Sequence, residues 1–113
     1  MSTNFRLITP VRMADLFDGR LNRVGVHEHQ SENATANCRC LTDGRNFLWV
    51  YGNNDGMVSE LIRYGMNAPQ SILRAIGAEF AVEIVSEYEP KYWGYETEEE
   101  CEAAWTEIGR AHV

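Results

Sequence analysis

Apolar residues recur at the three-to-four-residue spacing of a helix in three segments of the chain, residues 9–18, 67–78 and 97–109. Each segment begins at a capping signal. Thr9-Pro10 supplies a cap followed by a first-turn proline, and Asn67 is a second cap. Thr97 and Glu100 form a capping box. The pattern therefore predicts three helices.

Apolar and polar residues alternate, as in a half-buried strand, in residues 21–29, 37–41, 46–52 and 80–88. The second and third of these segments flank Thr42-Asp43-Gly44-Arg45, which contains the Asp-Gly pair favoured in hairpin turns. Pro90 ends the ladder of the last strand. The polar segment 30–37 is expected to be a loop.

The apolar pattern of residues 57–64 fits both the period of a helix and the alternation of a strand. Val58, Leu61 and Ile62 have helical spacing, whereas the alternate positions 58, 60, 62 and 64 suit a strand. The preceding Asn53-Asn54-Asp55-Gly56 turn favours a third strand of a meander.

Strands that cluster early and helices that cluster late are typical of an α+β fold. We expect one domain over residues 1–113, with an antiparallel sheet of about four strands and two to three helices packed on one face.

The charge of the chain is distributed unevenly. The net charge is −7, yet residues 1–78 hold eight arginines and seven carboxylates. Residues 79–107, named here the acidic segment, hold ten glutamates and one cation, Lys91. Because nucleic-acid binding needs a basic patch, direct binding of nucleic acid is not expected, whereas a basic protein partner is.

The apolar runs are too short to span a bilayer, and the start of the chain lacks the basic and apolar regions of a signal peptide. Three cysteines, two of them separated by a single residue, suit a disulfide framework poorly. These features predict a cytoplasmic protein that does not bind membranes.

Two short segments suggest a metal site. His27-Glu28-His29 and Cys38-Arg39-Cys40 each place two possible ligands on one face of a strand. If the segments pair across the loop, His27 lies opposite Cys40 and His29 opposite Cys38, and two imidazoles with two thiolates are a normal zinc shell. The spacing within each pair is unusual for zinc, so the alternative is that the cysteines are core residues and the histidines face solvent.

The acidic segment also contains a cluster of aromatic residues among its glutamates. Tyrosine and tryptophan dominate interface hot spots, and a charged rim accelerates encounter with a partner of opposite charge. The residues expected to form this interaction site are Glu87, Tyr88, Glu89, Tyr92, Trp93, Tyr95, Glu98, Glu99 and Glu102. The alternative is that Tyr88 and Trp93 close the core and that the glutamates are merely solvated.

Three functional hypotheses follow. The first is a non-enzymatic interaction module, of the type of inhibitor or immunity proteins, that binds a basic partner through its acidic, aromatic C-terminal third. The second is a small zinc-binding protein or enzyme centred on His27, His29, Cys38 and Cys40. The third is a homodimer joined through a sheet edge or the aromatic cluster.

Overall fold

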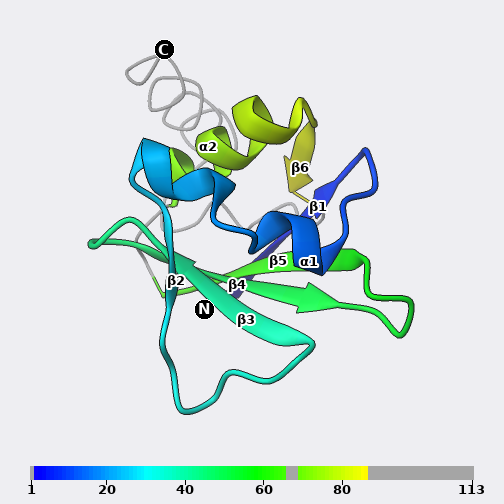
Figure 1. The fold of residues 1–113 in the computed structure, drawn as a ribbon, viewed down its shortest axis with the longest axis horizontal. Coiled ribbons are helices and arrows are strands. Elements are labelled where there is room, and N and C mark those ends of the chain that lie inside the picture. Colours follow the sequence, from blue (N-terminus) through cyan, green and yellow to red (C-terminus); the bar gives the residue numbers. More distant parts are fainter. Residues whose placement is uncertain (1, 66–68, 87–113) are drawn as a thin grey trace, which may run out of the picture.

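The computed structural model describes residues 2–65 and 69–86 of the chain, and the structural statements below concern these residues. Six strands of this part form one antiparallel sheet in the order β2-β3-β4-β5-β1-β6 (Figure 1). The strands are β1 (Ser2–Leu7), β2 (His27–His29), β3 (Cys38–Thr42), β4 (Phe47–Gly52), β5 (Val58–Tyr64) and β6 (Ile84–Ser86). The helices are α1 (Met13–Leu16), the 3-10 helix η1 (Arg20–Val24) and α2 (Gln70–Phe80).

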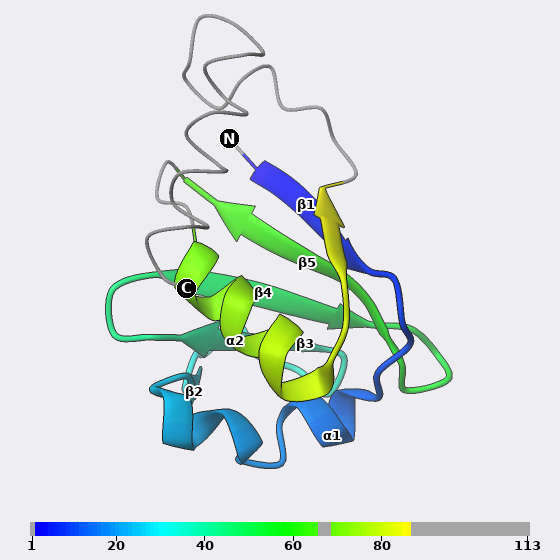
Figure 2. The same cartoon turned by 90° about the horizontal axis from the view of Figure 1, so that it is seen from above.

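The three helices lie on the same face of the sheet (Figure 2). Their apolar side chains meet those of the central strands in one core, which contains Phe5, Leu48, Val50, Leu61, Ile72 and Ile76, all 0% exposed. The broad α+β class is confirmed. The helices differ from the expectation, because among the described residues only α2 is a long α-helix, α1 has four residues and η1 is a 3-10 helix. The expected number of strands is wrong, because six are present among the described residues rather than about four.

The sequence analysis misses β1, which is a central strand. β1 pairs with β5 on one side and with β6 on the other, both antiparallel. Only Phe5 and Leu7 mark its buried face, together with the polar Thr3, which is 1% exposed. Because that buried face includes a threonine and the neighbouring Asn4 is also buried, the strand lacks a clear alternation of apolar and polar residues.

The expected strand over residues 21–29 is wrong in its first half. Residues 20–24 form η1, and β2 is limited to His27–His29. Gly19 and Gly25 bound η1 with φ values of 97° and 83°, a left-handed conformation that glycine adopts readily. These two glycines separate the turn from the strand, and Val24 is left 47% exposed rather than buried in a sheet.

Residues 58–64 form β5, as the turn chemistry predicts. β5 pairs with β4 through Trp49–Ile62 and Val50–Leu61, and with β1 on its other side. Two neighbouring strands thus satisfy its backbone hydrogen bonds, which removes the ambiguity of its side-chain pattern.

Helix α2 runs further than the sequence predicts and shortens the strand that follows. The expected cap at Asn67 lies outside the described residues, and the cap observed in the structure is Pro69. The helix continues through Phe80 and ends at Ala81, whose φ is 52°. Phe80, expected in a strand, instead stacks under the Arg20 guanidinium at 4.4 Å. The described part of the expected strand 80–88 is β6 alone, and the expected helix 97–109 lies outside the described residues.

The turn between β3 and β4 is tied to α2 by a single carboxylate. Asp43 accepts hydrogen bonds from the backbone amides of Arg45 and Asn46 at 2.9 and 2.7 Å. Its second oxygen accepts from the side-chain amide of Asn46 and from the hydroxyl of Ser71 in α2. Partial burial acts to raise the pKa of Asp43, but these donors outweigh it and lower the pKa to about 2.

We expect Asp43→Asn to lower the free energy of unfolding by about 1–2 kcal/mol at neutral pH, a value discounted for the partial exposure of the carboxylate. Since the folded pKa is depressed from 3.8 to about 2, the contribution is present above about pH 4 and is lost as the pH falls towards about 2. Urea unfolding of both proteins across this range measures it. A difference between the two proteins that is the same at both ends of the range would contradict the assignment.

Candidate binding face

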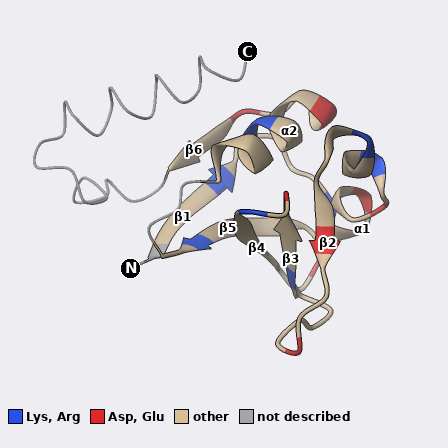
Figure 3. Ribbon diagram, turned by 90° about the vertical axis from the view of Figure 1, so that its left-hand side faces the viewer, with Lys and Arg blue, Asp and Glu red and all other residues tan. Residues whose placement is uncertain are grey.

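The sheet has a second face that no described helix covers (Figures 1 and 3). Side chains alternate along each strand, so the partners of the buried core residues point to this side. One row crosses it through directly paired positions, in the order His29, Cys40, Trp49, Ile62 and Asn4. This side of the sheet is named the uncovered face.

Aromatic side chains dominate the uncovered face. Phe47 and Tyr64 are 46% and 55% exposed, and Trp49 and Tyr51 are partly buried. The hydroxyl groups of Tyr51 and Tyr64 lie 3.1 Å apart, so a hydrogen bond joins the two side chains across neighbouring strands. This hydrogen bond, with partial burial, raises the pKa of Tyr51. The result is an aromatic surface made by neighbouring strands rather than by a loop.

Polar groups border this aromatic surface. The side-chain amide of Asn4 donates to Glu60 at 2.6 Å, across the β1–β5 pair. On the opposite side of the surface, the ring of His29 contacts Phe47 edge to face, with centroids 4.9 Å apart. The exposed apolar area of the uncovered face thus comes from Phe47 and Tyr64, since Cys40 and Ile62 of the row are buried, and side chains that can form hydrogen bonds border it.

The predicted His/Cys cluster is only partly brought together. β2 and β3 pair as expected, but the register differs by two residues: His29 lies opposite Cys40, and His27 lies opposite Thr42. Cys38 is opposite Tyr51 of β4, beyond the end of β2. The expected pairings of His27 with Cys40 and of His29 with Cys38 are therefore wrong, because Cys38 pairs with Thr35 of the connecting segment and His29 pairs with Cys40 instead.

The chemistry of the two described cysteines follows from burial. Cys40 is 1% exposed between its larger row neighbours, and this burial raises the pKa of its thiol to about 11. Cys38 is partly exposed beside Tyr51. Within residues 2–65 and 69–86, no group of three or more His, Cys, Asp or Glu side chains is arranged to hold a metal ion. Zinc binding stays a prediction that metal analysis must test.

The residues predicted to form the interaction site lie outside the described part of the chain, which ends at Ser86. The first glutamate of the acidic segment, Glu79, lies in the described part of the chain and forms an ion pair within the domain. Glu79 binds Arg23 of η1 at 2.5 Å, and its side chain is 12% exposed. Acidic and basic positions are interspersed over the described elements (Figure 3). Any concentrated negative surface must therefore come from the glutamates after Glu79.

Sequence reasoning missed the uncovered face as a site. The signal for it is present in β4, where Phe47, Trp49 and Tyr51 alternate with the buried Leu48 and Val50. Because β4 is apolar at almost every position, it resembles a strand buried on both faces. A strand with one open face and a strand buried on both faces therefore look alike in sequence. In the described part of the structure they are told apart because no helix lies on the second side of β4 (Figure 1).

No protein-family model, curated protein or solved structure matches this chain. Within the described residues, no helix is long and apolar enough to cross a membrane. The functional argument therefore depends on the chemistry of the described surfaces and of the sequence.

Proposed function

We propose that the protein is a non-enzymatic interaction module that binds a basic protein. Its acidic, aromatic C-terminal third attracts the partner, and the uncovered face of the sheet supplies an aromatic contact surface. The observation that carries this proposal is the exposure of Phe47 and Tyr64 beside Trp49 and Tyr51 on one side of the sheet.

Aromatic rings suit a basic partner for an electrostatic reason. The faces of tyrosine and tryptophan rings attract the guanidinium and ammonium groups of arginine and lysine. The fold already uses such contacts internally, because Arg39 lies 4.2 Å from the centre of the Phe17 ring. An incoming arginine could make the same contact at Tyr64, a residue that is 55% exposed.

The acidic segment contributes mainly to the rate of encounter. Ten glutamates against one lysine create a negative field over residues 79–107. Such a field speeds association with a basic protein, and salt weakens it. Partner binding is therefore expected to decrease as the ionic strength rises.

The test is affinity capture from a cell lysate with the full chain, at low and at high salt. We expect basic proteins to be captured at low salt and to be reduced by Glu98→Gln, Glu99→Gln and Glu102→Gln together. The control removes the same charge from exposed carboxylates elsewhere, with Asp18→Asn, Glu32→Gln and Asp55→Asn. Equal losses in the two triple variants would contradict a role for the acidic segment.

The contribution of the uncovered face is tested separately. Phe47→Ser with Tyr64→Ser is expected to weaken binding of the captured partner about thirtyfold or more at either salt concentration, since aromatic hot spots contribute about 2 kcal/mol or more. The control is Ile8→Ser with Val24→Ser, which removes two side chains of similar exposure, 49% and 47%, outside the aromatic surface. Full capture by the aromatic double variant would exclude this face as the contact.

A further inference from the structure

The sheet ends at β2 on one side, and the backbone of this edge strand can form further hydrogen bonds. β2 pairs only with β3, in a continuous register from His27–Thr42 to His29–Cys40. In such a ladder, every second residue directs its N–H and C=O away from the partner strand. In the described part of the chain, no backbone–backbone hydrogen bond outside this ladder involves β2. The outer edge of β2 is therefore open to a further strand.

β2 also lacks most of the features that protect the edge of a sheet. Natural edges are commonly blocked by a proline, by a lysine or by a bulge. β2 reads His27-Glu28-His29, so it contains neither residue type, and its register with β3 has no bulge. Its three side chains are exposed or partly exposed. Only its length of three residues limits what can pair with it, so the edge suits a short extended segment.

The charge at this edge decides between a second copy of the chain and a different partner. Glu28 is the central residue of β2, and the hydrogen bonds that it accepts from Arg39 lower its pKa, so the carboxylate is ionised at neutral pH. If two copies paired symmetrically about this residue, Glu28 would lie opposite Glu28 of the second copy. Like charges directly opposite each other destabilise a pair of strands. The edge therefore favours a strand that carries a cation opposite Glu28.

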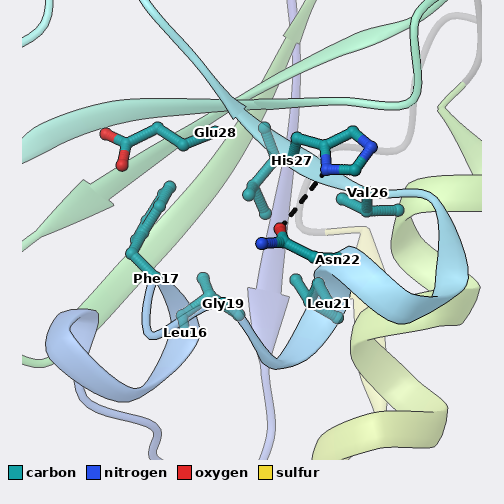
Figure 4. Close-up of a pocket in the computed structure, with 9 residues that line it drawn as sticks. Leu16, Phe17, Gly19, Leu21, Asn22, Val26, His27 and Glu28 are labelled. Carbon is teal, nitrogen blue, oxygen red and sulfur yellow. Dashed lines mark hydrogen bonds between the residues drawn. The ribbon is translucent and has the colours of Figure 1, made fainter.

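The carboxylate of Glu28 retains room for a second cation. A carboxylate offers about four acceptor positions, and Arg39 occupies two of them, at 2.8 and 2.6 Å. The Glu28 side chain is 30% exposed, and it lines a pocket of about 290 Å³ on the helix side of β2 (Figure 4). Because directly opposite side chains project to the same face of a sheet, a lysine or arginine opposite Glu28 reaches this open space.

We propose that the outer edge of β2 binds an extended basic segment of the protein partner by strand addition. Main-chain hydrogen bonds hold the segment, and a lysine or arginine opposite Glu28 gives the preference for a basic sequence. This inference rests on the proposed function, because it takes the partner to be basic, and it names the part of the partner that is bound. Since His29 of β2 contacts Phe47, the added strand also lies beside the aromatic surface of the uncovered face.

The test titrates the full chain with a blocked peptide of sequence TVKVT and follows amide shifts by NMR. TVEVT, with glutamate at the centre, changes only the charge, and TVKVT with its three central amides N-methylated keeps the charge but lacks the main-chain donors. We expect saturable shifts at His27, Glu28 and His29 with TVKVT and no binding of the methylated peptide. TVEVT should bind about 3–10-fold more weakly, the effect of replacing an opposite-charge pair by a like-charge pair.

Glu28→Gln assigns the charge preference to this carboxylate. It is expected to abolish or reverse the preference for TVKVT over TVEVT, because Arg39 then repels lysine while the main-chain hydrogen bonds stay in place. Glu32→Gln removes the same charge from an exposed position in the loop after β2 and should leave the preference unchanged. Equal affinity of the three peptides for the unmodified protein would overturn the proposal.

Sedimentation of the free chain tests the other occupant. A dimer whose formation excludes TVKVT from β2 would overturn the proposal and identify a second copy as the strand that is added. Lysate capture separates this inference from the proposed function. Shifts at β2 together with salt-independent capture would contradict the proposed function alone, whereas salt-dependent capture without shifts at β2 would contradict strand addition alone.

Discussion

Replacing Phe5 with alanine is expected to lower the free energy of unfolding by about 3–5 kcal/mol. Phe5 is 0% exposed in β1, opposite Leu61 of β5 and Ser86 of β6. The substitution removes the largest apolar side chain of the core and leaves a cavity between two central strands and the helices. Because domains of this size are stable by only about 5–15 kcal/mol, a loss of this size is a large fraction of the total stability.

Urea denaturation followed by circular dichroism measures this loss. Ile8→Ala is the matched control, since Ile8 lies just beyond the same strand and is 49% exposed, and it should shift stability by less than about 0.5 kcal/mol. Phe5→Leu keeps a folded protein available if the alanine variant fails to fold, with a smaller loss. A Phe5→Ala protein as stable as Ile8→Ala would show that β1 is not a central strand.

Replacing Ile76 with alanine is expected to cost about 2–5 kcal/mol of unfolding free energy. Ile76 is 0% exposed on the side of α2 that faces the sheet, in the same core as Phe5 and Leu61. α2 has 11 residues and lacks a side-chain cap. A helix of this length is marginal by itself in water, so packing of its apolar face stabilises it.

The same denaturation experiment tests the helix, with Ile76→Val and Val24→Ala as comparisons. Ile76→Val keeps most of the buried area and should cost about 0.5–1.5 kcal/mol. Val24 is 47% exposed on η1, so its truncation should have little effect. A loss for Ile76→Ala no greater than that for Val24→Ala would contradict the packing of α2 on the sheet.

Some candidate functional residues can be recognised from the sequence alone, whereas others are brought together only by the fold. The aromatic and acidic character of residues 87–102 is visible in the sequence because it is a matter of composition. The uncovered face is not visible in this way, because its row of side chains comes from five strands, β2, β3, β4, β5 and β1.

The His/Cys cluster shows how a small shift in strand register changes which residues meet at a site. The sequence correctly places the two segments on neighbouring antiparallel strands. The register, however, is set by the segment that connects the two strands, in which Thr35 pairs with Cys38. Since a shift of two residues keeps each side chain on its face but changes its partner, His29 meets Cys40 while His27 meets Thr42.

By itself, the sequence determined the elements whose signals are local: the β3–β4 hairpin with its Asp-Gly turn, the apolar side of α2 and the mixed α+β class. Only the tertiary structure decided the place of β1, the position of β5 between β4 and β1, and the face of the sheet that the described helices leave uncovered. The physical reason is that turns and helices satisfy their hydrogen bonds among near neighbours. A strand satisfies its hydrogen bonds with segments far away in the chain, so its partners and its buried face are set by the whole sheet.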